Sequence, residues 1–134
     1  MGGGLIIRVG DRAQIFDAAV SNHLTGLAQG LQRKDKTFRF QRRLMDAGTC
    51  EASVFQAFGY RTGAVCVGLG NYHNRDFRRK RIAAEYVSLR DVESMVTLFV
   101  EMVRQSEGLQ AIGGKSTPRL REERGDLGER MLVL

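Results

Sequence analysis

Residues 64–69 read Ala-Val-Cys-Val-Gly-Leu, and this stretch decides the fold class. It is short, contains no charged side chain and is rich in valine. Such a run predicts a central strand of a sheet whose two faces are both covered by helices. A loop over 70–81 follows, and residues 82–87 are expected to form a further strand.

Strands and helices alternate along the rest of the chain as far as residue 107. The expected strands cover 5–9 and 37–41, and the expected helices cover 18–32, 52–58 and 90–106. Asp17 and Ser88 are placed to cap the first and the last of these helices. The last helix carries an apolar stripe at Val92, Met95, Val96, Phe99, Met102 and Val103. This alternation indicates an α/β layered domain with a mixed sheet and helices on its faces.

The 134 residues are enough for one domain. We assign residues 1–107 to the α/β domain and residues 108–134, which are charged and contain glycines and a proline, to a tail. No apolar stretch approaches the roughly 20 residues of a membrane span, and no signal-peptide pattern is visible. We therefore expect a cytoplasmic protein without a membrane partner, with Cys50 and Cys66 as reduced thiols.

The formal net charge is +6 at pH 7, and one concentrated basic patch lies at 75–81. It holds four arginines and Lys80, with Phe77 among them. A solvated loop is the favoured interpretation, because basic patches attract polyanions without proving a role. We do not expect nucleic acid as a partner. A small basic nucleic-acid-binding domain is the alternative, and it would show a steep salt dependence of binding.

Two loops follow the carboxyl ends of predicted strands, at 44–51 and 70–81. Ligands of open α/β sheets gather at such ends. The first loop contains Gly48, Thr49 and Glu51, and the second contains His73. We therefore expect the His73 imidazole to be exposed and to converge with the Glu51 side chain on one cleft.

Three short motifs follow one another in a characteristic order. They are Gly-Thr-Cys-Glu-Ala at 48–52, Gly-Ala-Val-Cys-Val-Gly-Leu-Gly-Asn-Tyr-His-Asn at 63–74, and Glu-Tyr-Val-Ser-Leu-Arg-Asp at 85–91. With Arg-Val-Gly-Asp-Arg at 8–12, this order resembles the C-terminal half of the co-catalytic dinuclear zinc aminopeptidases of the glutamyl and deblocking type. The resemblance spans roughly residues 4–105. It departs from the family pattern at Cys50, in the Tyr-His-Asn context of His73 and in the basic insert.

The resemblance implies a metallopeptidase that cleaves peptide or acyl-amino bonds and holds two zinc ions in its complete site. It makes His73 a zinc ligand and places Gly48, Thr49 and Glu51 on the substrate side. The other ligands and the catalytic glutamate belong to the family's N-terminal half. A two-zinc site needs several His and carboxylate ligands and a glutamate base, which one histidine cannot supply. We therefore expect a fragment that provides one zinc ligand at most and no catalytic residue, and that is inactive alone.

Residue types alone leave other interpretations open. His73 could hold a turn through hydrogen bonds, Glu51 could be a first-turn residue favoured by the helix dipole, and Glu85 reads as a solvent-facing strand residue. His23 reads as a helix residue without a site role. Cys50 lacks a nearby histidine in the sequence, so a cysteine hydrolase is not expected.

A function of another class is that of a non-catalytic domain that associates through an unfinished sheet. Half a sheet leaves an open edge and an uncovered apolar face, and both favour association with a partner. The expected partners are the missing N-terminal half, another protein chain or a second copy of this chain.

Overall fold

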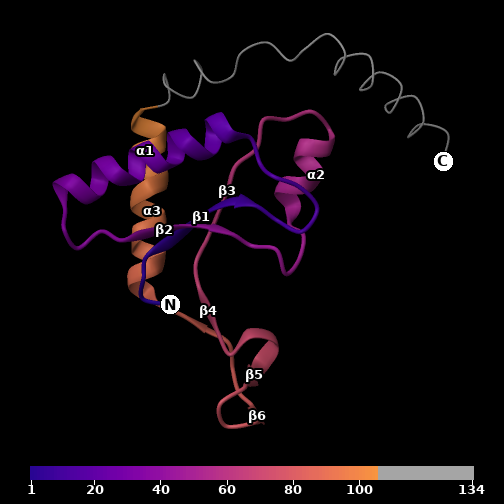
Figure 1. Cartoon of the computed structure of the whole chain (residues 1–134). Helices are drawn as coiled ribbons and strands as arrows, with labels where there is room; N and C mark the ends of the chain where they lie inside the picture. The colour runs from indigo at the N-terminus through magenta and orange to yellow at the C-terminus, as the bar shows by residue number, and fades with distance from the viewer. Residues whose placement is uncertain (106–134) are drawn as a thin grey trace, which may run out of the picture.

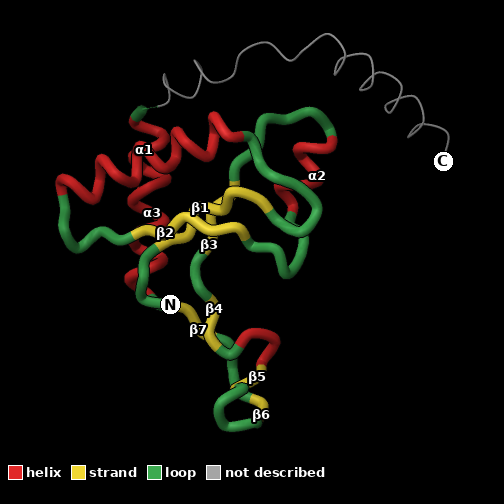
Figure 2. Tube along the Cα trace, in the orientation of Figure 1, coloured by secondary structure: helices red, strands yellow, loops and turns green. Residues whose placement is uncertain are grey.

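The computed structural model describes residues 1–105, which are built around a three-stranded sheet (Figures 1 and 2). The strand order is β2 (Phe40–Leu44), β1 (Leu5–Gly10) and β3 (Ala64–Cys66). β1 pairs in parallel with β2 and antiparallel with β3. The predicted α/β class with a mixed sheet is therefore confirmed, whereas the tail assigned to 108–134 lies outside the described residues.

The two long helices begin where the sequence predicts. α1 (Ala18–Lys34) is capped by Asp17, whose carboxylate accepts hydrogen bonds from the N–H groups of Ala19 and Val20 at 2.8 and 3.0 Å. α3 (Leu89–Arg104) is capped by Ser88, whose hydroxyl accepts a hydrogen bond from Asp91 N–H. Each side chain takes up a donor that the first turn of a helix leaves unpaired.

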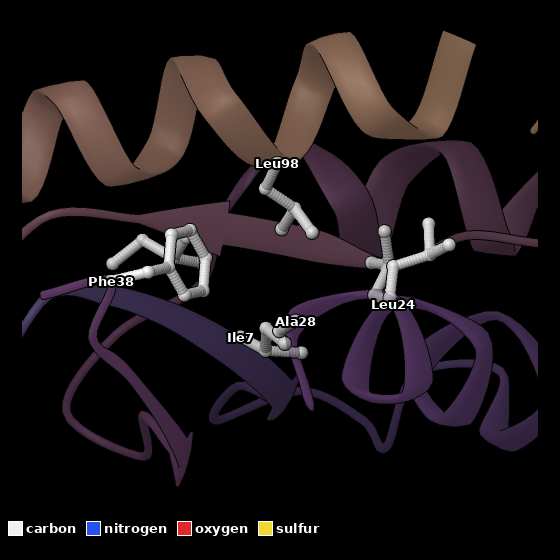
Figure 3. Packing of buried hydrophobic residues seen from close by; sticks show 7 residues of the cluster. Ile7, Leu24, Ala28, Phe38 and Leu98 are labelled. Carbon is white, nitrogen blue, oxygen red and sulfur yellow. The ribbon is translucent and has the colours of Figure 1, made fainter. Parts of the chain in front are cut away.

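The core lies between the two long helices and β1, as Figure 3 shows. α1 and α3 contact each other, and both contact β1, so they cover the same face of the sheet. The buried cluster consists of Leu5, Ile7, Leu24, Leu27, Ala28, Phe38 and Leu98. Leu5 and Ile7 are two positions apart on β1, so their side chains point to the same face of the sheet, where the helices bury them.

The face of α3 that packs against this core coincides only in part with the predicted stripe, of which Met95 and Met102 pack against the core cluster. Its most buried residues are Asp91, Ser94 and Leu98, whereas Val96 and Val103 of the predicted stripe are 52% and 71% exposed. The helix is apolar on more than one face, so apolar periodicity could not identify the buried one. The structure therefore leaves an apolar face of α3 uncovered by the described residues.

The buried carboxylate of Asp91 ties the start of α3 to the chain segment before β1. It accepts hydrogen bonds from Gly2 N–H at 2.7 Å and from Gly4 N–H at 2.8 Å. Gly4 has a φ of +85°, and a Cβ at this position would meet the backbone oxygen of Arg39. A glycine is required there because the neighbouring chain passes so close.

The second strand lies further along the chain than predicted. Residues 35–38 form a turn instead, in which Asp35 accepts hydrogen bonds from Thr37 N–H and Phe38 N–H. Phe38 is buried in the core from this turn, and β2 begins only at Phe40. The alternating polarity of 37–41 therefore combines a buried aromatic in a turn, Phe38, with the first two residues of β2.

The predicted strands over 64–69 and 82–87 are each split in two. β3 ends at Cys66 and lies at an edge of the three-stranded sheet, where β1 is the central strand. β4 (Leu69–Gly70) then pairs with β7 (Tyr86–Val87), and β5 (Arg75–Asp76) pairs with β6 (Arg81–Ile82). We call residues 69–87 the ribbon. It projects away from the sheet and the long helices (Figures 1 and 2).

The split follows from close packing at the base of the ribbon. A Cβ at Gly68 would lie 3.2 Å from the Met1 nitrogen, and a Cβ at Gly70 would lie 2.4 Å from the Tyr86 ring. The two glycines let the chain leave the sheet between these neighbours. None of the described helices has the length and apolar character needed to cross a membrane.

Candidate functional site

His73 lies in the middle of the ribbon, between two short ladders. The base ladder pairs Leu69 with Val87 and Gly70 with Tyr86, and the tip ladder pairs Arg75 with Ile82 and Asp76 with Arg81. Three further hydrogen bonds cross the ribbon between the ladders: Asn71 Nδ2 to the Ala84 carbonyl at 2.8 Å, His73 N–H to Glu85 Oε1 at 2.7 Å, and Ala83 N–H to the Asn74 carbonyl at 3.0 Å. The backbone of His73 is thus held from both sides.

The backbone around His73 is strained. Asn71, His73 and Asn74 have φ values of +53°, +58° and +56°, in the left-handed region that favours glycine. Asparagine tolerates this conformation, but for other residues with a Cβ it costs roughly 1–2 kcal/mol. Strain of this kind persists only where surrounding contacts enforce it, and it clusters at functional sites. Of the three hydrogen bonds that cross the ribbon here, the one to Glu85 acts on the His73 backbone directly.

The imidazole of His73 is exposed, as the sequence predicts. Its ring packs against the ring of Tyr72, with the centroids 4.1 Å apart. An exposed imidazole on a fixed backbone can place a ring nitrogen on a zinc ion. Glu85 is exposed, as its interpretation as a solvent-facing residue predicts. One of its carboxylate oxygens also accepts a hydrogen bond from the His73 backbone N–H.

The described residues do not complete a metal site. In residues 1–105 no group of three or more His, Cys, Asp or Glu side chains is placed to hold a metal ion. A zinc site requires at least three protein ligands. The described residues could therefore supply part of a zinc ligand set at most.

The turn that contains Gly48, Thr49 and Glu51 is organised by a buried carboxylate, Asp11. Asp11 accepts hydrogen bonds from Cys50 N–H at 2.9 Å and from the Ser53 hydroxyl, and Arg12 N–H donates to the Gly48 carbonyl. The turn leads into α2 (Glu51–Ala57), with Thr49 and Glu51 exposed.

The Ser53 hydroxyl, together with backbone N–H groups, holds the pKa of Asp11 below its ordinary value. We did not single out Asp11 from the sequence. The available signal was an acidic residue directly after a strand that ends in Gly10.

The structure does not bring His73 and Glu51 together. The loop over 44–51 follows the carboxyl end of β2, which runs parallel to β1. β3 runs antiparallel to β1, so the ribbon that follows it leaves from the opposite end of the sheet (Figure 1). Both loops do follow strand ends, but the expected convergence on one cleft would require parallel strands. The substrate role of Gly48, Thr49 and Glu51 stays a prediction.

The remaining candidates are His23, Cys50 and Cys66, and all three are half-buried. His23 is half-buried on α1, with its Nε2 atom buried and without a hydrogen-bond partner among the described residues. Cys50 and Cys66 are both free thiols, as expected. Burial raises the pKa of the Cys66 thiol, which makes it a poor nucleophile.

Comparison with known proteins bears on the fold. No protein-family model and no curated protein matches the sequence. A TET aminopeptidase from a marine-sediment Thaumarchaeota archaeon is similar in structure, with a TM-score of 0.58 and 20% identity over 76% of this chain and 26% of its own. PhTET1-12s, described as a dodecamer, gives a TM-score of 0.56 and 21% identity over 77% of this chain and 27% of its own. The chain thus has the fold of part of an aminopeptidase and spans about a quarter of the length of these structures.

Proposed function

We propose that this chain is part of a zinc-dependent aminopeptidase or closely related hydrolase of peptide or acyl-amino bonds, and that His73 is one of its zinc ligands. The observation that carries the proposal is the aminopeptidase fold of the described residues, with an exposed histidine held in a strained ribbon. Gly48, Thr49 and Glu51 are proposed as substrate-side residues on the resemblance alone.

In this proposal the chain contributes to the reaction by holding one zinc ligand in position. Two zinc ions, when bound, would activate a water molecule and polarise the scissile carbonyl. His73 would contribute one nitrogen to that centre, and Glu85 would fix the backbone from which the imidazole projects. The other ligands and the general base would come from a segment or chain that supplies the rest of the domain. The isolated chain is therefore inactive.

The test has two arms. The isolated chain, given zinc or cobalt, should not hydrolyse aminoacyl-nitroanilides. A polypeptide that also contains an in-frame upstream segment with a His-x-Asp motif and a Glu-Glu pair should hydrolyse them, and chelator should abolish this activity. Chelator-sensitive turnover by the isolated chain at about 1 to 1,000 per second would contradict the fragment proposal. The absence of any such segment, upstream or in a partner chain, would contradict the enzymatic proposal.

A second candidate is a non-catalytic domain that binds a partner through its open sheet. β3 pairs with β1 on one side, and no strand of the described residues pairs with its other side. The exposed apolar face of α3 lies next to the same core. A protein that associates but never binds zinc, even with the upstream segment present, would favour this candidate.

A further inference from the structure

The tip of the ribbon is exposed to solvent, as the sequence favours, and it forms a short β-hairpin. β5 and β6 pair with each other, and the tip projects from the body of the domain (Figure 2). Residues 75–82 hold five basic side chains and one carboxylate, in a chain whose formal net charge is +6. Most of the excess positive charge among the described residues is therefore presented on one narrow, accessible element.

The single carboxylate neutralises this charge only weakly. Asp76 lies 3.9 Å from Arg79 Nη1 and 3.8 Å from Arg81 Nε, which are long contacts from a half-buried carboxylate to two largely exposed arginines. Exposed pairs of this kind contribute little. Arg78 and Lys80 form no ion pair within residues 1–105. The tip keeps most of its charge available to an external anion.

The same hairpin presents apolar surface to solvent. Phe77 is 68% exposed and Ile82 is 88% exposed. Both line a hollow of about 500 Å³ together with Arg75, Asp76, Lys80 and Arg81. The guanidinium of Arg75 lies over the Phe77 ring, 5.2 Å from its centre, so a cation covers one face of this exposed aromatic ring.

We propose that the ribbon tip binds single-stranded nucleic acid. Proteins that bind single strands combine a positively charged groove for the phosphates with exposed aromatic rings on which bases stack. Arginine, which supplies four of the five cations, binds phosphate through two parallel hydrogen bonds. A hollow suits a flat base flanked by phosphates better than it suits the smooth surface of a bilayer. The inference is independent of the proposed zinc site.

Fluorescence polarisation with a labelled oligo-dT of about 20 nucleotides tests this inference on the full chain. Neutralisation of four or five phosphates predicts a slope of log affinity against log salt of about −3. The triple variant R78Q/R79Q/K80Q should reduce the magnitude of this slope by about 2. Phe77→Ala removes one stacking platform and should weaken binding by about 5- to 140-fold.

The matched control is R33Q/K36Q/R39Q, which removes the same charge from exposed residues outside the ribbon. It should change the slope much less than the tip variant does. Equal effects of the two triple variants, or no effect of Phe77→Ala, would overturn the inference. Preferential binding to phosphatidylserine vesicles would replace it with a membrane surface. Displacement of the oligonucleotide by polyglutamate at equal charge concentration would replace it with an acidic protein partner.

Discussion

Glu85 accepts a hydrogen bond from the backbone N–H of His73, with 2.7 Å between the two atoms. This contact crosses the ribbon at His73, whose backbone, like those of Asn71 and Asn74, is in the left-handed conformation. It links the proposed zinc ligand to a carboxylate 12 positions later in the sequence, which the sequence alone assigns to the surface.

Replacing Glu85 with alanine should release His73 from its fixed conformation. The lost hydrogen bond is exposed, so we expect a cost of about 0.5–1.5 kcal/mol to the ribbon and little effect on global unfolding. Amide hydrogen exchange at His73 should therefore accelerate by roughly two- to tenfold. Glu93→Ala is the control, since Glu93 is also exposed and its carboxylate forms no hydrogen bond within residues 1–105. Unchanged exchange at His73 in the Glu85 variant would show that other contacts hold this backbone.

Asp11 should make the stability of the domain depend on pH in the acidic range. The Ser53 hydroxyl and backbone N–H groups lower the pKa of Asp11 in the folded chain below its value in the unfolded chain. The stabilisation is therefore present above the ordinary aspartate pKa of about 4 and is lost as the pH falls below it. Asp11→Asn should be less stable at pH 7 and should show a flatter decline of stability between about pH 5 and pH 2.

Thermal unfolding across this pH range measures the effect. Ser53→Ala should reproduce part of it, because its hydroxyl is the main cause of the lowered pKa. Asp46→Asn is the matched control on an exposed aspartate. An identical pH profile for wild type and Asp11→Asn would mean that Asp11 does not couple proton binding to folding.

Local signals in the sequence were sufficient for the helix starts and for the fold class. Asp17 and Ser88 were predicted as caps because a cap depends only on the residues immediately after it. The splitting of residues 64–69 depends instead on Met1 and Tyr86, which approach Gly68 and Gly70 from distant parts of the sequence. Periodicity within a segment contains no information about such neighbours.

The site was predicted less well than the fold for a similar reason. The exposure of His73 followed from its place after a strand. Its separation from Glu51 followed from the direction of β3 relative to β2, which a list of strands does not determine. The hydrogen bond to Glu85 could not be predicted either, because residues 82–87 read as one regular strand, whereas the structure interrupts it between β6 and β7.

Leu98 should be the residue of α3 on which folding depends most. It is completely buried and belongs to the cluster between α1, α3 and β1. Leu98→Ala should lower the free energy of unfolding by about 2–5 kcal/mol, because it removes buried methyl groups and leaves a cavity. Val103→Ala is the control on the same helix, since Val103 is 71% exposed, and it should change stability by less than about 0.5 kcal/mol. Urea unfolding measures both. Equal effects would mean that α3 packs through a different face.

The chain, expressed alone, should self-associate through the uncovered face of α3. Leu89, Val96, Val100 and Val103 are 77%, 52%, 44% and 71% exposed and recur at helical spacing along this face. Light scattering at high micromolar concentration should detect species larger than 15.0 kDa. Replacing both Val96 and Val100 with glutamine should shift the population toward monomer, because it removes apolar surface whose burial drives association. Val54→Gln is the matched control on α2, where the valine is 58% exposed. A wild-type chain that stays monomeric and unfolds cooperatively would show that the domain is stable without a partner. The proposals that a partner covers the apolar face of α3 or pairs with the edge of β3 would then fail.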